Sequence, residues 1–240
     1  IASTQLAREL ADSAVEREID RFLLQANVRA PKPFDLASIP VPSSVAAEKA
    51  VAYVKNHLEP SIFNHSNRVY YLGAAMVADY LPQWNFDLDT YFLTSIFHGI
   101  GISPDFQLKT PLSFEYWGGI NAREKLVEFG ASQFQADEVA EAIIRHTDMI
   151  DGNLRQNGVV LQMTTTLDIR GCNPQWFHSH TIDQIVKEFP RQGFKDDFAR
   201  AVERETEGKP GCYTSFRDIP AYLNYIWTNP VMAVYDNAQD

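Results

Sequence analysis

Cysteine is scarce in this 240-residue chain, which contains only Cys172 and Cys212. The two residues follow no metal-binding spacing and form no disulfide framework, so zinc-finger and disulfide-stapled folds are excluded and free thiols are expected. Long apolar runs are also lacking, because none approaches the roughly 18 to 20 residues that span a bilayer. No signal peptide is visible, although the chain begins at Ile1 rather than Met. We therefore expect a cytoplasmic protein with no membrane partner.

Positive charge is limited as well. The chain has 21 Lys and Arg residues against 31 Asp and Glu residues, for a formal net charge of -10. A nucleic-acid-binding protein needs a basic face to neutralise phosphates, and electrostatic attachment to anionic lipid needs basic segments. We therefore expect neither nucleic acid nor membrane as a partner. A small-molecule substrate is expected instead, and homo-oligomerisation stays open.

The alternating pattern of β-strands is almost absent, whereas apolar residues recur at helical spacing along the chain. A hydrophobic content of 45% is enough to form a packed core. The sequence therefore predicts an all-α, single-domain helical bundle over residues 44–240. Residues 1–43 are expected to form an N-terminal helix (Leu6, Leu10, Ile19, Phe22 and Leu23) and a proline-rich connector (Pro31, Pro33, Pro40 and Pro42) that pack on this core.

Helices are predicted from a cap at Ser43 or Ser44 to Leu58, and then over residues 61–81, 88–100, 113–129, 133–146, 159–170, 180–189, 194–205 and 221–227. The segment 88–100 is apolar on more than one face, which is typical of a central buried helix. The last segment carries Tyr222, Tyr225 and Trp227, which either cover the core or form a dimer contact.

Four ionisable residues lie on apolar helix faces, namely His65, His98, His146 and Asp168. A lone core histidine is usually a satisfied hydrogen-bonding group, and a buried carboxylate needs a cation or several hydrogen bonds. Four such residues on four inward faces are harder to explain in this way. Helical bundles build metal sites from side chains on facing helices, so this set is a candidate functional site.

The chain resembles the fungal-type cyanamide hydratase group of the HD superfamily over residues 45–214. The resemblance is carried by Phe63-Asn64-His65-Ser66-Asn67-Arg68-Val69, Phe97-His98, Ser113-Phe114-Glu115-Tyr116-Trp117-Gly118-Gly119-Ile120, Glu141-Ala142-Ile143-Ile144-Arg145-His146-Thr147-Asp148, Thr165-Thr166-Leu167-Asp168 and Glu188-Phe189-Pro190-Arg191. Members of this group are helical zinc enzymes that add water to cyanamide, giving urea. The resemblance implies an HD-type bundle in which His65, His98 and Asp168 are metal ligands and His146 is a pocket histidine.

The chain departs from this family pattern at the expected site. Gly99 stands where relatives have the Asp of the His-Asp pair, and Ile169 stands where they have Asn. Gly211 and Tyr213 replace Trp and His. The remaining three ligands could still hold zinc, or iron as a second choice, since two histidines and a carboxylate form an ordinary catalytic set. The loss of one carboxylate could equally leave the site without metal.

Three functions are consistent with these residues. The first is metal-assisted hydration or lyase chemistry on a small nitrile-like substrate, as the resemblance implies. The second is a diverged enzyme of secondary metabolism that cyclises, isomerises or eliminates on a larger apolar metabolite, with or without metal. In that case the acid–base groups are His146, Asp148 and Tyr213, and the pocket residues are Gly99, Tyr116, Trp117, Thr165 and Ile169. The third is a non-catalytic relative, or a protein inactivated by an engineered Asp-to-Gly change.

Overall fold

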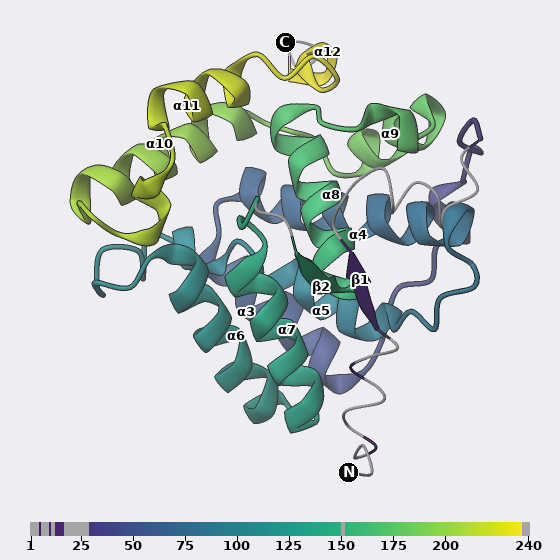
Figure 1. The fold of residues 1–240 in the computed structure, drawn as a ribbon, viewed down its shortest axis with the longest axis horizontal. Coiled ribbons are helices and arrows are strands. Elements are labelled where there is room, and N and C mark those ends of the chain that lie inside the picture. Colours follow the sequence, from purple (N-terminus) through teal and green to yellow (C-terminus); the bar gives the residue numbers. More distant parts are fainter. Residues whose placement is uncertain (1–4, 6–9, 11–12, 17–28, 150–151, 237–240) are drawn as a thin grey trace.

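The computed structural model describes residues 5, 10, 13–16, 29–149 and 152–236 of the chain (Figure 1). The elements in chain order are β1 (Ala14–Glu16), η1 (Leu36–Ser38), α3 (Val45–His57), α4 (Pro60–Tyr80), α5 (Leu88–Phe97), η2 (Ile100–Ile102), α6 (Phe114–Phe129), α7 (Gln133–Arg145), β2 (Asn153–Arg155), α8 (Gln156–Arg170), η3 (Pro174–Trp176), α9 (Ser179–Glu188), α10 (Phe194–Gly208), η4 (Tyr213–Phe216), α11 (Ile219–Trp227) and α12 (Ala233–Asp236). The prediction of an all-α bundle is confirmed.

Helix starts follow local capping chemistry. The Ser44 side chain accepts a hydrogen bond from the Ala47 backbone N–H, and Ser132 does the same for Gln135. These bonds satisfy amide groups that have no partner within the helix. Helix α8 ends at Gly171, which adopts a φ of 71°. A glycine reaches this left-handed conformation without steric cost. The predicted helix boundaries therefore agree with the observed ones to within a few residues.

Helices α5 and α8 form the centre of the bundle. Every residue of α5 from Thr90 to Phe97 is buried, and α8 packs against α4, α5 and α7 (Figure 1). Each fully buried large apolar side chain contributes about 1.5–3 kcal/mol to stability. The interior positions of α5 therefore supply much of the driving force for folding, and they hold the end of this helix in place. Among the described residues, no helix has the length and apolar character needed to cross a membrane.

A close approach between two segments fixes the exit from α5. The helix ends at Phe97, three residues earlier than predicted, and a short 3-10 turn follows at Ile100–Ile102. A Cβ atom on Gly101 would collide with the backbone carbonyl of Phe114, where α6 begins. Glycine is needed here because α6 starts directly against this turn. The contact places His98 and Phe114 beside the same cavity.

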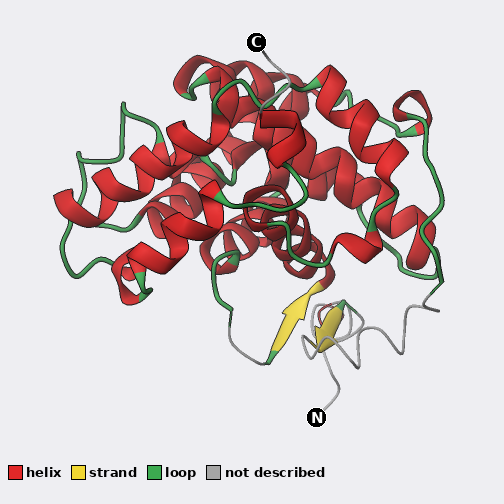
Figure 2. Cartoon of the chain, turned by 90° about the horizontal axis from the view of Figure 1, so that it is seen from above, coloured by secondary structure: helices red, strands yellow, loops and turns green. Residues whose placement is uncertain are grey.

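The described residues contain one small antiparallel strand pair that the sequence did not predict. It joins β1 to β2, and Val15 lies opposite Leu154. Figure 2 shows both strands at one edge of the helical bundle. Each strand is only three residues long, so an alternating pattern cannot emerge in the sequence. Both Val15 and Leu154 are buried, and their tertiary pairing decides the local structure.

The predicted N-terminal helix lies mostly outside the described residues, including Leu6, Ile19, Phe22 and Leu23. Residues 14–16 of this segment form β1, so the predicted helix does not run through these three residues. The connector at residues 29–44 contains only the short turn η1 among its described residues. The proposed division of the chain at residue 44 stays a prediction.

Candidate active site

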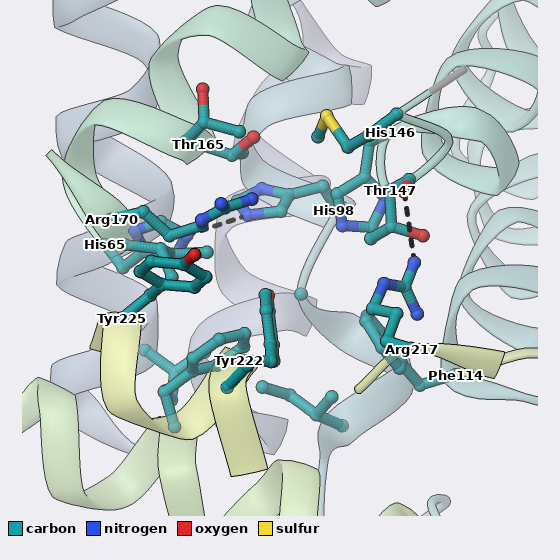
Figure 3. A pocket seen from close by; sticks show the side chains of 18 of the residues that line it. His65, His98, Phe114, His146, Thr147, Thr165, Arg170, Arg217, Tyr222 and Tyr225 are labelled. Carbon is teal, nitrogen blue, oxygen red and sulfur yellow. Dashed lines mark hydrogen bonds between the residues drawn. The ribbon is translucent and has the colours of Figure 1, made fainter. Parts of the chain in front are cut away.

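A cavity of about 410 Å³ lies between the start of α4, the end of α5, and helices α8, α10 and α11. We call it the central cavity. Its walls are mainly apolar, and they include Ile62, Ile102, Phe114, Ile169, Phe198 and Phe216. Three histidines line the same space, namely His65, His98 and His146 (Figure 3). Thr165, Ile169 and Gly99, predicted as substrate-binding residues, also line this cavity.

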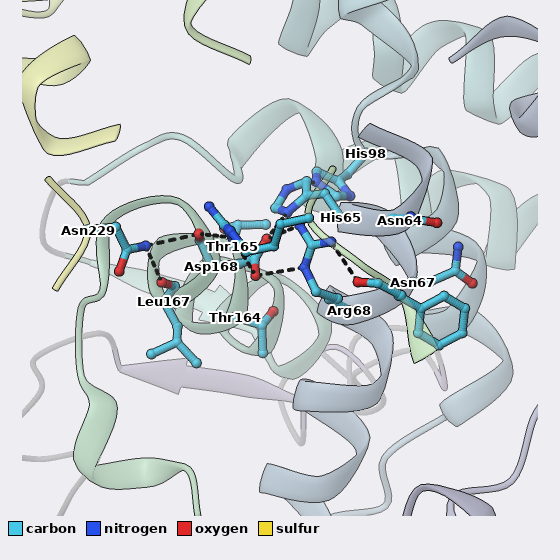
Figure 4. Close-up of polar contacts among 12 residues, drawn as sticks. Asn64, His65, Asn67, Arg68, His98, Thr164, Thr165, Leu167, Asp168 and Asn229 are labelled. Atoms are coloured by element: carbon cyan, nitrogen blue, oxygen red, sulfur yellow. Dashed lines mark hydrogen bonds and ion pairs between the residues drawn. The ribbon is translucent and has the colours of Figure 1, made fainter. Parts of the chain in front are cut away.

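Asp168 contacts the His65 ring and fixes its orientation. The Nδ1 atom of His65 on α4 lies 2.6 Å from Oδ2 of Asp168 on α8, and both residues are buried (Figure 4). Arg68 donates to the same carboxylate from Nε at 2.9 Å and from Nη2 at 2.8 Å. The Nη1 atom of Arg191 lies 3.2 Å from Oδ1 of Asp168. Asp168 therefore orients the His65 ring and is itself compensated by two guanidinium groups.

This charge arrangement keeps Asp168 ionised. Burial by itself raises the pKa of a carboxyl group, but Arg68, Arg191 and the hydrogen bond from His65 hold the pKa of Asp168 well below its usual range. An ionised carboxylate can only accept hydrogen bonds, so the proton between the two groups belongs to Nδ1 of His65. The Nε2 atom of His65 is then the ring nitrogen that faces the cavity.

His98 directly follows α5 and His146 directly follows α7, and each is also held by a hydrogen bond at Nδ1. Nδ1 of His98 donates to the Ser95 carbonyl at 2.7 Å, and Nδ1 of His146 donates to the Ile143 carbonyl at 2.6 Å. A carbonyl oxygen only accepts, so each Nδ1 carries the proton. Burial lowers the pKa of His65, lowers that of His98 well below its usual value, and lowers that of His146 to about 4. All three imidazoles are therefore neutral near pH 7, with Nε2 unprotonated.

The three rings lie close together. Nε2 of His98 is 3.1 Å from Nε2 of His65, and the ring centroids of His98 and His146 are 5.5 Å apart. The site therefore presents several unprotonated ring nitrogens, each of which can accept a proton. This clustering of neutral bases is the main chemical property of the cavity.

The expected metal ligands do not assemble into a metal centre. Among the described residues, no group of three or more His, Cys, Asp or Glu side chains is arranged to hold an ion. Both Asp168 oxygens are engaged as described above, and Gly99 contributes no side chain, which leaves the nitrogens of His65 and His98. Catalytic zinc sites generally use three protein ligands. The residues present therefore do not fit the expected centre, and the expectation of zinc or iron rests on the family resemblance alone.

The other predicted site residues form a second cluster outside the walls of the central cavity. The Tyr213 hydroxyl donates to the Asp148 carboxylate, and the Tyr116 and Tyr213 rings meet edge to face at 5.5 Å. Trp117 stacks on Phe106 at 4.5 Å. The structure thus brings Asp148, Tyr213 and Tyr116 together, and neither these three residues nor Trp117 line the cavity. Their assignment to catalysis or substrate binding stays a prediction.

Several residues of the cavity escaped the sequence reasoning. Tyr222 and Tyr225 of α11 line it, and a dimer contact through the C-terminal aromatics stays a prediction. Arg170 and Arg217 also line it, and neither lies in a pattern that predicts a site. Glu115 in the first turn of α6 is fully buried and accepts hydrogen bonds from Thr147 and Thr214.

No family model matches the chain. It is 36% identical over 203 residues to Cyanamide hydratase DDI2 of Saccharomyces cerevisiae, with 84% of this chain and 88% of the relative covered. Cyanamide hydratase DDI3 of the same yeast matches with the same identity and coverage. Identity at this level over most of both chains shows common descent and a common fold. The chain therefore belongs to the cyanamide hydratase family.

Proposed function

We propose that this protein is a hydratase-like lyase that acts on a substrate larger and more apolar than cyanamide. The observation that carries the proposal is a set of three neutral imidazoles at the wall of a roomy, mainly apolar cavity. Family membership supports the reaction type, since the two yeast relatives are named as cyanamide hydratases. The size and lining of the cavity support the larger substrate.

The cavity is large for cyanamide. It measures about 410 Å³, whereas cyanamide has only three non-hydrogen atoms. Cyanamide alone would leave most of this volume to water held against phenylalanine and isoleucine side chains, which is unfavourable. Binding pockets of about 300–1,000 Å³ suit ligands of drug-like size. An apolar group attached to the nitrile-like centre would fill the space.

The imidazoles can perform the proton transfers of hydration. The oxygen of a water molecule bonds to the nitrile carbon while one π pair of the C–N bond moves to nitrogen. Nε2 of His98 accepts the proton from water and then returns it to that nitrogen, after which the product tautomerises to the amide or urea. The transient imidazolium of His98 would donate to Nε2 of His65 at 3.1 Å, and His65 is in turn bonded to Asp168. The positive charge is thereby stabilised without leaving the protein interior.

Elimination or isomerisation is the second candidate. The same neutral bases could remove a proton from carbon, and a large apolar cavity would exclude water from the intermediate. This candidate needs no nitrile in the substrate. It shares with hydration the dependence on His98 and the preference for a bulky substrate.

The test compares two substrates that differ only in size. Purified protein is incubated with cyanamide or with N-benzylcyanamide, and formation of urea or N-benzylurea is measured by chromatography. We expect kcat/KM for N-benzylcyanamide to exceed that for cyanamide by at least about tenfold, the effect of roughly 1.4 kcal/mol of additional transition-state binding. His98→Asn is the inactive control, and His57→Asn is a matched histidine change outside the cavity.

Equal or better turnover of cyanamide would overturn the proposed substrate size. Absence of turnover with both compounds, in folded protein, would overturn the proposed hydration and favour the second candidate.

A further inference from the structure

Arg170 is a charged residue of the central cavity whose charge has no partner among the described residues. It is the last residue of α8 and lines the cavity beside Thr166, four residues earlier on the same helix face. Within the described part of the chain it makes no hydrogen bond and no ion pair, and its Nε atom is buried without an acceptor. Its described contact is with the ring of Tyr225, whose centroid lies 4.5 Å from the guanidinium carbon (Figure 3).

The other charges around the cavity are accounted for. Arg217 donates to Glu115 at 3.4 Å and to the carbonyls of Thr214 and Thr147 at 3.1 Å. Asp218 accepts from the Ala221 backbone N–H at 3.1 Å as the cap of α11, and no ion pair joins it to Arg170. Arg170 is therefore the uncompensated cation among the described residues that line the cavity.

A structural explanation covers only part of this arrangement. A positive residue in the last turn of a helix is favoured by the helix dipole. That effect does not require a buried Nε without a hydrogen-bond acceptor, which is unfavourable for a charged group. Stacking on Tyr225 orients the guanidinium plane but supplies no acceptor. A ligand that brings an acceptor would remove the cost.

The neighbouring tyrosine supplies a second donor. Tyr222 lines the same cavity, and its hydroxyl has no hydrogen-bond partner among the described residues. A guanidinium group presents a planar fork that matches a carboxylate, and a phenolic hydroxyl can donate a further bond. The apolar residues that line the same cavity fit an apolar body of such a ligand.

We propose that Arg170, with the hydroxyl of Tyr222, binds a carboxylate of the substrate, so that the ligand is an apolar acid. This inference rests on the proposed function for the identity of the reacting group, but the carboxylate site itself is a binding property. The apolar body of the ligand would lie against Phe198, Phe216 and Ile169. Its reacting end would face the three histidines.

The test measures equilibrium binding and requires no turnover. The probes are 4-phenylbutyrate and its neutral amide, 4-phenylbutyramide, titrated into the full-length protein by calorimetry at pH 7. We expect the acid to bind at least about tenfold more tightly than the amide, as for a charge-assisted bidentate contact. Arg170→Gln should abolish this preference, and Arg170→Lys should retain only part of it because the fork is lost.

Arg123→Gln is the matched control, since it removes one positive charge from an exposed ion pair with Asp137. It should leave the preference for the acid unchanged. His98→Asn should also retain the preference while abolishing turnover, so that failure of the carboxylate site and failure of the hydratase proposal are distinguishable. Equal affinity for acid and amide, an undiminished preference in Arg170→Gln, or no binding of either probe at millimolar concentration would each overturn the inference.

Discussion

The Nε2 atoms of His65 and His98 lie 3.1 Å apart, although neither carries a proton in the resting protein. Both Nδ1 atoms are committed as donors, to Asp168 and to the Ser95 carbonyl. Two nitrogen lone pairs therefore face each other inside the protein, and a cation between them is favoured electrostatically. In the proposed reaction this cation is the proton taken from water.

This relationship predicts a large effect of His98→Asn. General-base catalysis typically contributes about 10²- to 10⁴-fold, so kcat for N-benzylcyanamide should fall by that order while the far-UV circular dichroism spectrum is unchanged. His57→Asn should retain activity, because His57 lies outside the cavity and bonds to Asp105. An active His98→Asn enzyme would contradict the assignment.

Metal content should depend on position 99. Protein purified without chelator or histidine tag should contain far less than one zinc per chain, and Gly99→Asp should raise this content several-fold, as measured by mass spectrometry of the elements. A Cβ at Gly99 would lie 3.3 Å from Cγ2 of Ile62 and 3.9 Å from Oγ of Ser66, a buried hydroxyl with no hydrogen-bond partner among the residues that the structure describes. Only a small shift of Ile62 is therefore needed.

Gly99→Asn is the control for this experiment, because it adds a side chain of the same shape without the charge. Near-stoichiometric zinc in the unmodified protein that disappears in His65→Ala would contradict the prediction and restore a metal-dependent mechanism.

Stability should fall as the pH is lowered from about 6.5 toward 4. Burial lowers the pKa of His146 from 6.5 to about 4, so in this range the unfolded chain binds a proton that the folded protein does not. The free energy of unfolding therefore decreases with falling pH, by roughly 3 kcal/mol for His146 once the pH reaches 4. His65 and His98 act in the same direction.

Urea unfolding at several pH values measures this slope. His146→Asn should flatten it, because this variant has no imidazole at the position to take up the proton. A slope that does not change in His146→Asn would show that this residue is not held neutral by burial.

The Asp168 network should be essential for stability. Asp168→Asn leaves the guanidinium groups of Arg68 and Arg191 buried without their shared carboxylate, and both are fully buried. Breaking a buried pair in this way costs about 3–5 kcal/mol. Asp137→Asn, in an exposed pair with Arg123, should cost at most about 1 kcal/mol. Chemical denaturation of both variants would check the difference, and similar losses would contradict it.

The helical bundle could be predicted from local features of the sequence. The spacing of apolar residues located α3 to α11 to within a few residues, because amphipathic periodicity and the caps at Ser44 and Gly171 are local properties. The sequence also identified His65, His98, His146 and Asp168, because ionisable groups on apolar faces must lie in the interior. It did not find the strand pair, since pairing of Val15 with Leu154 depends on contacts between distant segments.

The contacts that these residues make depend on how the helices pack and could not be predicted from the sequence. Asp168 has a carboxylate that could bind a metal. In the fold, however, Arg68 contacts it from 100 residues away in sequence and Arg191 from 23 residues away. No local pattern in the sequence predicts these contacts. That the charge of Arg170 has no partner in the described part of the chain is equally invisible in sequence, because it depends on which acidic groups the fold brings near it. Helix formation is set by neighbouring residues, whereas compensation of buried charge is set by the way in which helices pack.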